Sequence, residues 1–473
     1  MSTRVEQAAW MPGWASWMTL VALIAIGMTT NWWVATGLLV VFLRQVARPF
    51  EFLSSYLLVT LAAAFIRYEA GELTIELSLL SGLILFMLAS YAVSQPDRLL
   101  TLPRTKLLLP LLVYVGLSLA NYVRGLLAGY SAKFASLELL PVLALATAPL
   151  VANGFDFRRH LKPVAVAVLA LGLASAGLGY AFFAVYHVRT GGIQYTPVPG
   201  IAAMMAINLA LRSGRPLPSV GWTLVAVALL VHQFISFTRG IWLGCIAGLL
   251  ACALLYAWRG DRTAHRLRRV GLVYASLLGL GLVGAVGLGL ALGQTDFLAL
   301  AGSRFGSIGG TEFTHQNASK VVRFAEYAEV ISHIAVSPWL GHGLGYTFSF
   351  REPIGFTVIE QWYSHQIYLF IWLKQGIVGL AAFVWMLFTA VAMGARGSRR
   401  HDDPWESAWL ATSAAATVLV AVTDLSNFQL GGVHVTFPLA LLWGGAIAIS
   451  REGLIRFRWA PASAAPPRAG VEA

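Results

Sequence analysis

Three arginines and one histidine stand at the ends of apolar segments or in the polar stretches between them: Arg189, Arg239, Arg323 and His365. A guanidinium is always charged, and its planar fork of N–H donors matches the oxygens of a phosphate group. An imidazole titrates near neutral pH and can take a proton from a hydroxyl group. Together, these residue types suit a reaction in which a hydroxyl attacks and a diphosphate leaves.

Each of the four residues also has a structural interpretation when taken singly. An arginine at the end of a membrane helix often reaches toward lipid headgroups, and a histidine at such a boundary can be a satisfied structural residue. The functional interpretation therefore depends on whether the four side chains converge, which is a question of topology.

Composition places the chain in a membrane. The 473 residues are 58% hydrophobic and 11% charged, which lies far outside the range of soluble globular proteins. Only helices and closed barrels satisfy the backbone inside a bilayer, and a spanning helix needs about 20 apolar residues. The apolar segments here are long and continuous rather than alternating, so the sequence predicts helices.

The predicted fold class is an all-α polytopic bundle of 12 to 14 spans, because several of the early segments are short. The apolar segments lie near residues 15–29, 31–43, 52–66, 75–94, 106–124, 133–151, 161–186, 197–212, 219–237, 239–257, 267–292, 364–394, 406–424 and 433–450.

The net charge is +12, and the distribution of the basic residues follows the positive-inside rule. The positive charge therefore does not indicate nucleic-acid binding. Clusters of arginine and lysine fall in alternate loops, as at Arg158, Arg159 and Lys162 or at Arg396, Arg399 and Arg400. This pattern predicts a protein of the bacterial inner membrane with both termini in the cytoplasm. It also places Arg189, Arg239, Arg323 and His365 on the same, periplasmic face.

The chain divides into four predicted regions. Residues 1–292 form transmembrane helices with short loops, residues 293–363 form one large periplasmic loop, residues 364–450 form the C-terminal transmembrane helices, and residues 451–473 form a cytoplasmic tail. A loop of this length is much longer than a connection needs, and such loops usually carry function.

Within the large loop, the sequence predicts an amphipathic helix from Asn317 to about His333, followed by a glycine-rich turn over residues 337–345. Arg323 could form an intrahelical ion pair with Glu326 on a solvated face of this helix, which is the structural alternative to a functional role. The glycines of the turn do not follow a strand, so a dinucleotide site is not expected.

The segment that begins with His365 resembles a known pattern. His365-Gln366, nine residues, Gly376, two residues and Gly379 resemble the pattern of bacterial O-antigen ligases. The helix start Thr238-Arg239-Gly240-x-Trp242 and the turn around Gly341, Gly343 and Gly345 are similar to the wider superfamily of O-antigen ligases and O-antigen polymerases. The resemblance extends from about Arg189 to Gly379.

The resemblance implies a glycosyltransferase that moves a glycan from undecaprenyl diphosphate to a lipid A core sugar at the periplasmic face. No metal or other cofactor is expected. Arg189 and Arg239 would bind the donor diphosphate, Arg323 would orient or neutralise it, and His365 would activate the acceptor hydroxyl. Lys320 and Gln366 are further candidates for binding substrate. The family also implies inversion at the anomeric carbon.

Two alternatives stay open. A polymerase of O-antigen or exopolysaccharide shares the donor and differs in its acceptor, which would be a growing glycan. A transporter of lipid or polysaccharide would predict interrupted helices in matched halves of the chain, and the sequence shows no convincing repeat. Membrane lipids are expected to surround the protein in every case.

Overall fold

The computed structural model describes residues 101–154, 156–186, 197–236, 238–258, 263–291, 318–450 and 454–456. The four predicted spans before residue 101, Arg189, residues 293–317 of the predicted loop and the C-terminal tail beyond residue 456 lie outside these ranges. The predictions about those parts stay predictions.

The described chain is mostly helical, which confirms the all-α part of the predicted fold class, whereas the span count and the periplasmic position of the large loop stay predictions. Its helices are α6 (Leu108–Leu127), α7 (Ala132–Ala146), α8 (Ala148–Gly154), α9 (Phe157–Tyr186), α10 (Val198–Arg212), α11 (Pro216–Ile235), α12 (Arg239–Ala257), α13 (Thr263–Ala291), α15 (Ala318–Val336), α16 (Ile367–Arg400), α17 (Pro404–Thr423) and α18 (Val433–Ser450). Short antiparallel pairs join β1 (Thr101–Pro103) to β4 (Leu454–Arg456) and β2 (Phe348–Arg351) to β3 (Val358–Gln361).

Nine spans among the described residues are long and apolar enough to cross a membrane, with α7 and α8 forming one of them. Every predicted apolar segment between residues 106 and 450 coincides with a helix. α10 has 15 residues and is shorter than each of these nine spans. All of its residues are buried, among α9, α11 and α17. The total of 12 to 14 spans includes the segments before residue 101 and stays a prediction.

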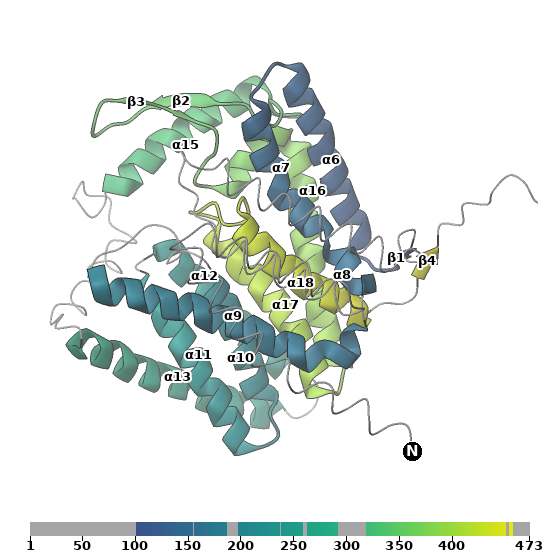
Figure 1. Ribbon diagram of the computed structural model, residues 1–473, viewed down its shortest axis with the longest axis vertical. Coiled ribbons are helices and arrows are strands. Elements are labelled where there is room, and N and C mark those ends of the chain that lie inside the picture. The colour runs from purple at the N-terminus through teal and green to yellow at the C-terminus, as the bar shows by residue number, and fades with distance from the viewer. Residues whose placement is uncertain are drawn as a thin grey trace, which may run out of the picture.

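α15 and the β2–β3 hairpin lie at the top of the bundle in Figure 1, and we call this end the α15 end. The sequence predicts helices in the large loop but does not predict the hairpin. β2 alternates buried and exposed residues, and its inward residues Phe348 and Phe350 pack against Val330 and Ile334 of α15. The hairpin therefore covers an apolar face of α15. Packing against this helix, which is distant in sequence, stabilises the segment as two strands.

α12 packs closely against α17 through three glycines spaced four residues apart, Gly240, Gly244 and Gly248. A Cβ atom at Gly244 would lie 2.0 Å from Thr423 Oγ1 and 2.5 Å from the carbonyl oxygen of Leu419. Small residues at this spacing let two membrane helices approach each other closely. The contact fixes the start of α12, where Arg239 lies, against the end of α17.

α16 is broken at Gly376, which has φ 69° and ψ −175°. The break frees carbonyl groups that accept hydrogen bonds from the chain following α15: His342 N donates to Leu373 O at 2.9 Å, and Gly343 N donates to Lys374 O at 2.8 Å. A Cβ atom at Gly376 would lie 2.0 Å from the carbonyl oxygen of Trp339. The glycine at this point of the sequence motif therefore allows the segment after α15 to dock into the break.

A buried ion pair fixes the same docking from the side of α7. The ammonium group of Lys374 binds the Glu138 carboxylate, and both side chains are fully buried. The second carboxylate oxygen of Glu138 accepts a hydrogen bond of 2.7 Å from Gly345 N, and Lys374 also donates to the carbonyl oxygen of Tyr346. One buried pair thus binds α7, α16 and the glycine-rich turn together.

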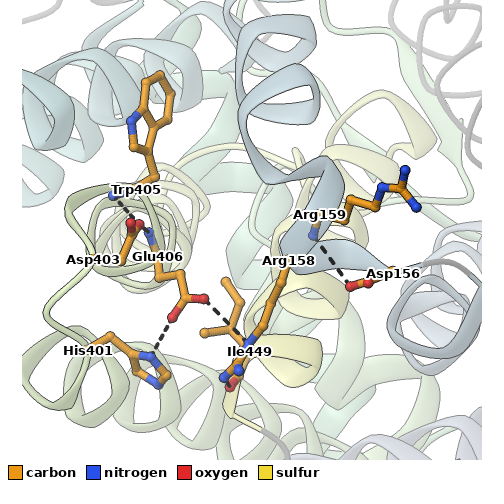
Figure 2. Close-up of polar contacts among 8 residues, drawn as sticks. All are labelled: Asp156, Arg158, Arg159, His401, Asp403, Trp405, Glu406 and Ile449. Carbon is orange, nitrogen blue, oxygen red and sulfur yellow. Dashed lines mark hydrogen bonds and ion pairs between the residues drawn. The ribbon is translucent and has the colours of Figure 1, made fainter. Parts of the chain in front are cut away.

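The opposite end of the bundle carries a polar network that Figure 2 shows. Asp403 caps α17 by accepting hydrogen bonds of 2.9 Å from Trp405 N and Glu406 N. Glu406 pairs with Arg158 at 3.4 Å and with His401 at 2.7 Å, and Arg158 donates to the carbonyl oxygen of Ile449 at 3.0 Å. This network joins the beginnings of α9 and α17 to the ends of α16 and α18.

Further basic residues that the sequence analysis placed on one side of the membrane also lie at this opposite end. Arg212, at the end of α10, binds Ser407 Oγ at 2.9 Å, and Arg269, near the start of α13, donates to the carbonyl oxygen of Ala210 at 3.0 Å. The described basic loops are therefore gathered at one end of the bundle. The compartment that this end faces stays a prediction.

The close approach of α12 and α17 can be tested with one added methyl group. We expect Gly244→Ala to lower the midpoint of thermal unfolding of the purified protein in detergent, because overpacking a tight contact costs roughly 1–3 kcal/mol. Gly221→Ala is the matched control, since Gly221 lies inside α11 with nothing within 4 Å of an added Cβ. Equal unfolding midpoints for Gly244→Ala and wild type would contradict the close contact.

Candidate active site

His365 lies directly before α16 at the α15 end of the bundle. Its side chain is 33% exposed, and its Nδ1 atom is 2.6 Å from Glu326 Oε2 of α15. The backbone N–H of His365 donates to the other carboxylate oxygen, Glu326 Oε1, at 2.8 Å. The carboxylate of Glu326 is fully buried, so the histidine is held by two bonds to one buried group.

The contact with Glu326 determines which nitrogen of His365 is free. With the carboxylate ionised, Glu326 can only accept in this hydrogen bond, which assigns the proton to Nδ1. The neutral imidazole then has a lone pair at Nε2, and within the described residues Nε2 has no hydrogen-bond partner. A partly exposed imidazole with a free Nε2 can take a proton from a substrate.

α15 is positioned by a buried stripe at helical spacing. Glu326, Val330 and Ile334 are buried at intervals of four residues, and the apolar members pack with Leu373 of α16. This packing turns the Glu326 carboxylate toward the start of α16. The segment that docks into the break of α16 follows the end of α15 directly, so the whole helix is fixed over His365.

Arg323 lies one turn before Glu326 and does not pair with it. Its Nη1 atom donates to the carbonyl oxygen of Ser426 at 2.6 Å. Ser426 belongs to the loop between α17 and α18. The expected alternative, an ordinary intrahelical pair of Arg323 with Glu326, is therefore not the arrangement found, because Glu326 is occupied by His365.

The loop between α17 and α18 brings the cationic elements together. Asp424 closes this loop by accepting hydrogen bonds from Gln429 N at 2.6 Å and Leu430 N at 2.8 Å. Burial raises the pKa of Asp424 well above its ordinary value, although these two bonds oppose the rise. Asn427 of the loop faces Gly240, where a Cβ atom would lie 2.2 Å from the amide nitrogen. The loop thus contacts both the start of α12 and, through Ser426, α15.

Arg239 and Lys320 bring further positive charge to this region. Arg239 is the first residue of α12, and the N-terminus of a helix favours anions. The pKa of Lys320 is lowered, first by partial burial and then by the positive charge of Arg239. The two cations are therefore close enough to act on each other, and an anion placed between them would relieve their repulsion.

Aromatic side chains surround the histidine. The ring of Tyr363 lies 5.3 Å from the ring of His365, and Phe428 lies 5.6 Å from Tyr363. Burial raises the pKa of Tyr363, and Glu326 raises it further while Arg323 lowers it. Burial likewise raises the pKa of Tyr327 to about 12. Both tyrosines are therefore uncharged at neutral pH.

The structure brings together most of the predicted site residues. Arg239, Lys320, Arg323 and His365 all lie at the α15 end, around the start of α16 and the loop between α17 and α18. Gln366 is the N-cap residue of α16, and its side chain makes no cap hydrogen bond. Arg189 follows the end of α9 and lies outside the described residues.

Two residues of the site, Glu326 and Ser426, are not predicted as site residues from the sequence. The signal for Glu326 was present, because an acidic residue at four-residue spacing from Val330 and Ile334 on an apolar stripe must have a buried partner. For Ser426 there was no such signal, because the group that binds Arg323 is a backbone carbonyl.

Comparison with known proteins gives one family match. Residues 224–384 match the model of a family described as O-antigen ligase, whereas no curated protein matches the chain. The matched region contains Arg239, Lys320, Arg323 and His365, together with the break at Gly376. It ends before the loop that closes on Asp424. Residues 224–384 are therefore similar to the O-antigen ligase family, and this match supports a membrane enzyme of the O-antigen ligase or polymerase type.

Proposed function

We propose that this protein transfers a glycan from undecaprenyl diphosphate to a lipid A core sugar at the periplasmic face of the bacterial inner membrane. The observation that carries the proposal is the one-third exposed imidazole of His365, fixed through Nδ1 by Glu326 at 2.6 Å, at the same end of the bundle as Arg239, Lys320 and Arg323. A base beside a group of fixed cations suits a hydroxyl nucleophile and an anionic leaving group.

The cations would hold the donor diphosphate. Arg239 at the start of α12, together with Lys320 and Arg323 on α15, offers several charge-assisted donors to phosphate oxygens. Arg189 is proposed as a fourth member of this group. Positive charges fixed by the protein stabilise the diphosphate as it accumulates negative charge, and this electrostatic contribution is a large one in catalysis. The chemistry would therefore proceed without a metal ion.

The histidine would activate the acceptor. The acceptor hydroxyl gives its proton to His365 Nε2 while its oxygen forms a bond to the anomeric carbon of the donor glycan. The bond between that carbon and the phosphate oxygen breaks, and its electron pair leaves with the diphosphate. Direct displacement inverts the anomeric carbon. Gln366, beside the base, is proposed to bind the acceptor.

The acceptor distinguishes this function from that of a polymerase, which would pass the glycan to another carrier-linked glycan. The two enzymes share donor and base, so the arrangement of cations and histidine fits both. A transporter would need no base, and the fixed pair of His365 with Glu326 favours an enzyme over that alternative.

The role of His365 can be tested in a strain that lacks this protein. Complementation with wild type should restore glycan on the lipid A core, whereas His365→Ala should leave bare core and carrier-linked glycan, with residual transfer reduced by about 10²-fold or more. Gel electrophoresis and mass spectrometry of lipopolysaccharide and of carrier-linked glycan measure both products.

The outcomes separate the candidate functions. Bare core with long carrier-linked glycan establishes the ligase, whereas single repeats on the core indicate a polymerase. Full rescue by His365→Ala would exclude His365 as the general base and favour the transporter. The level of the His365→Ala variant in the membrane and its unfolding midpoint in detergent verify that it is inserted and folded.

The cation group makes a separate prediction about the donor. In proteoliposomes with purified donor and acceptor, we expect Arg239→Ala to raise the KM for the diphosphate-linked donor about tenfold or more, because one charge-assisted contact is lost. The KM for the acceptor should change much less. Arg400→Ala, which removes an exposed arginine at the opposite end of the bundle, is the control.

An unchanged response of Arg239→Ala to donor concentration would argue against a diphosphate site at the start of α12.

The same assay in the presence of EDTA should retain full activity. If EDTA abolishes activity and magnesium restores it, the result would contradict diphosphate binding by the cations alone and indicate a metal site.

A further inference from the structure

We propose that Glu326 is the positioning residue for His365. Its buried carboxylate holds the imidazole as the Nδ1–H tautomer, directs Nε2 toward the acceptor, and stabilises the imidazolium that forms when the proton is taken. The kinetic part of this inference rests on the proposed function, whereas the state of the imidazole can be measured without a substrate.

Glu326 contacts His365 at two points, one on the ring and one on the backbone. Glu326 Oε2 binds the ring nitrogen of His365 at 2.6 Å, and Glu326 Oε1 binds its backbone nitrogen at 2.8 Å. A single bond would let the ring swing about it, whereas the second bond also fixes the backbone from which the ring extends. The ring direction is therefore set by α15, although His365 itself precedes α16.

Burial explains why this contact is more than an incidental ion pair. The Glu326 side chain is fully buried, while that of His365 is one-third exposed. A buried carboxylate without a partner costs several kcal/mol, so carboxylates are seldom fully buried unless they are paired. Here the partner is a group that can gain or lose its charge, and the buried carboxylate contacts the Nδ1 side of the ring.

The obvious competitor for Glu326 is engaged elsewhere. Arg323, one turn earlier on α15, donates to the carbonyl oxygen of Ser426 at 2.6 Å. Other titratable groups around the pair are Tyr327 on α15 and Tyr363 before α16, whose pKa values burial raises. From the side of α17 and α18, Asp424 bonds Gln429 N and Leu430 N, and His434 lies near Gln429 Oε1 at 3.1 Å.

A second pair of glutamate and histidine on α15 shows the contrast. Glu329 lies 3.2 Å from His333 Nε2, and the two side chains are 41% and 27% exposed. The other ring nitrogen of His333 contacts the hydroxyl of Tyr346 at 2.8 Å. Both nitrogens of His333 are thus engaged, whereas Nε2 of His365 has no partner in the described part of the chain. The Glu329 pair is therefore a matched control on the same helix.

The kinetic test compares Glu326→Gln with Glu329→Gln in the full chain, reconstituted with donor and acceptor. The glutamine amide can donate to Nδ1, which places the proton of the imidazole on Nε2 and removes the base. We expect kcat to fall about 10²-fold or more in Glu326→Gln, with the donor KM changed by less than about threefold. The acid limb of the activity profile should move to lower pH. Glu329→Gln should behave as wild type.

The second measurement needs no substrate. Diethyl pyrocarbonate modifies the unprotonated imidazole, and mass spectrometry of the His365 peptide gives the labelling rate at each pH. Loss of the carboxylate charge disfavours the imidazolium, so the pH of half-maximal labelling should fall by about one unit in Glu326→Gln. Glu326→Asp keeps the charge on a side chain one methylene shorter, and should give a midpoint and a kcat between those of wild type and Glu326→Gln.

The two measurements separate failure of this inference from failure of the proposed function. Equal labelling midpoints in wild type, Glu326→Gln and Glu326→Asp would overturn the positioning role, even if His365→Ala abolishes transfer. A lowered midpoint together with full transfer by His365→Ala would establish the pair and reject the proposed base. A fall in kcat in Glu329→Gln equal to that in Glu326→Gln would show a general effect on α15 and also overturn the inference.

Discussion

The break in α16 at Gly376 ties the candidate site to the bundle. An uninterrupted helix would use the carbonyl groups of Leu373 and Lys374 internally, whereas the break presents them to the segment that follows α15. The same helix begins just after His365. Docking into its break therefore sets the distance between α15 and the histidine. Because the positive φ at Gly376 and the contact with Trp339 exclude a side chain, this geometry depends on glycine.

The two buried carboxylates, Glu138 and Glu326, have different roles in this arrangement. Glu138 and Lys374 are both fully buried and bind each other and nearby backbone groups, and the pair holds α7, α16 and the glycine-rich turn together. Glu326 is equally buried, but its partner His365 is open on one side. Burying a charge is costly unless a partner offsets it, and the second pair directs that interaction toward a group that can react.

The helices were predictable, because continuous apolar segments of the required length allow few other structures. The convergence of Arg239, Arg323 and His365 also followed from topology, since alternate loops must lie on alternate sides. The β2–β3 hairpin was not predicted, because its burial depends on Val330 and Ile334 of α15. Likewise, the partners of Glu326 and Arg323 could not be assigned. Spacing along a helix favours the pair Arg323 and Glu326, but tertiary contacts with His365 and Ser426 replace it.

That exchange of partners has an electrostatic consequence. An ion pair between Arg323 and Glu326 would cancel both charges and leave neither for a substrate. A carbonyl oxygen carries no net charge, so the bond from Arg323 to Ser426 fixes the direction of the guanidinium while its full positive charge and its other N–H donors remain. Glu326 meanwhile acts on the imidazole of His365. Separate partners thus keep the cation available for an anion and the histidine available as a base. Both depend on the loop closed by Asp424, which supplies the carbonyl of Ser426.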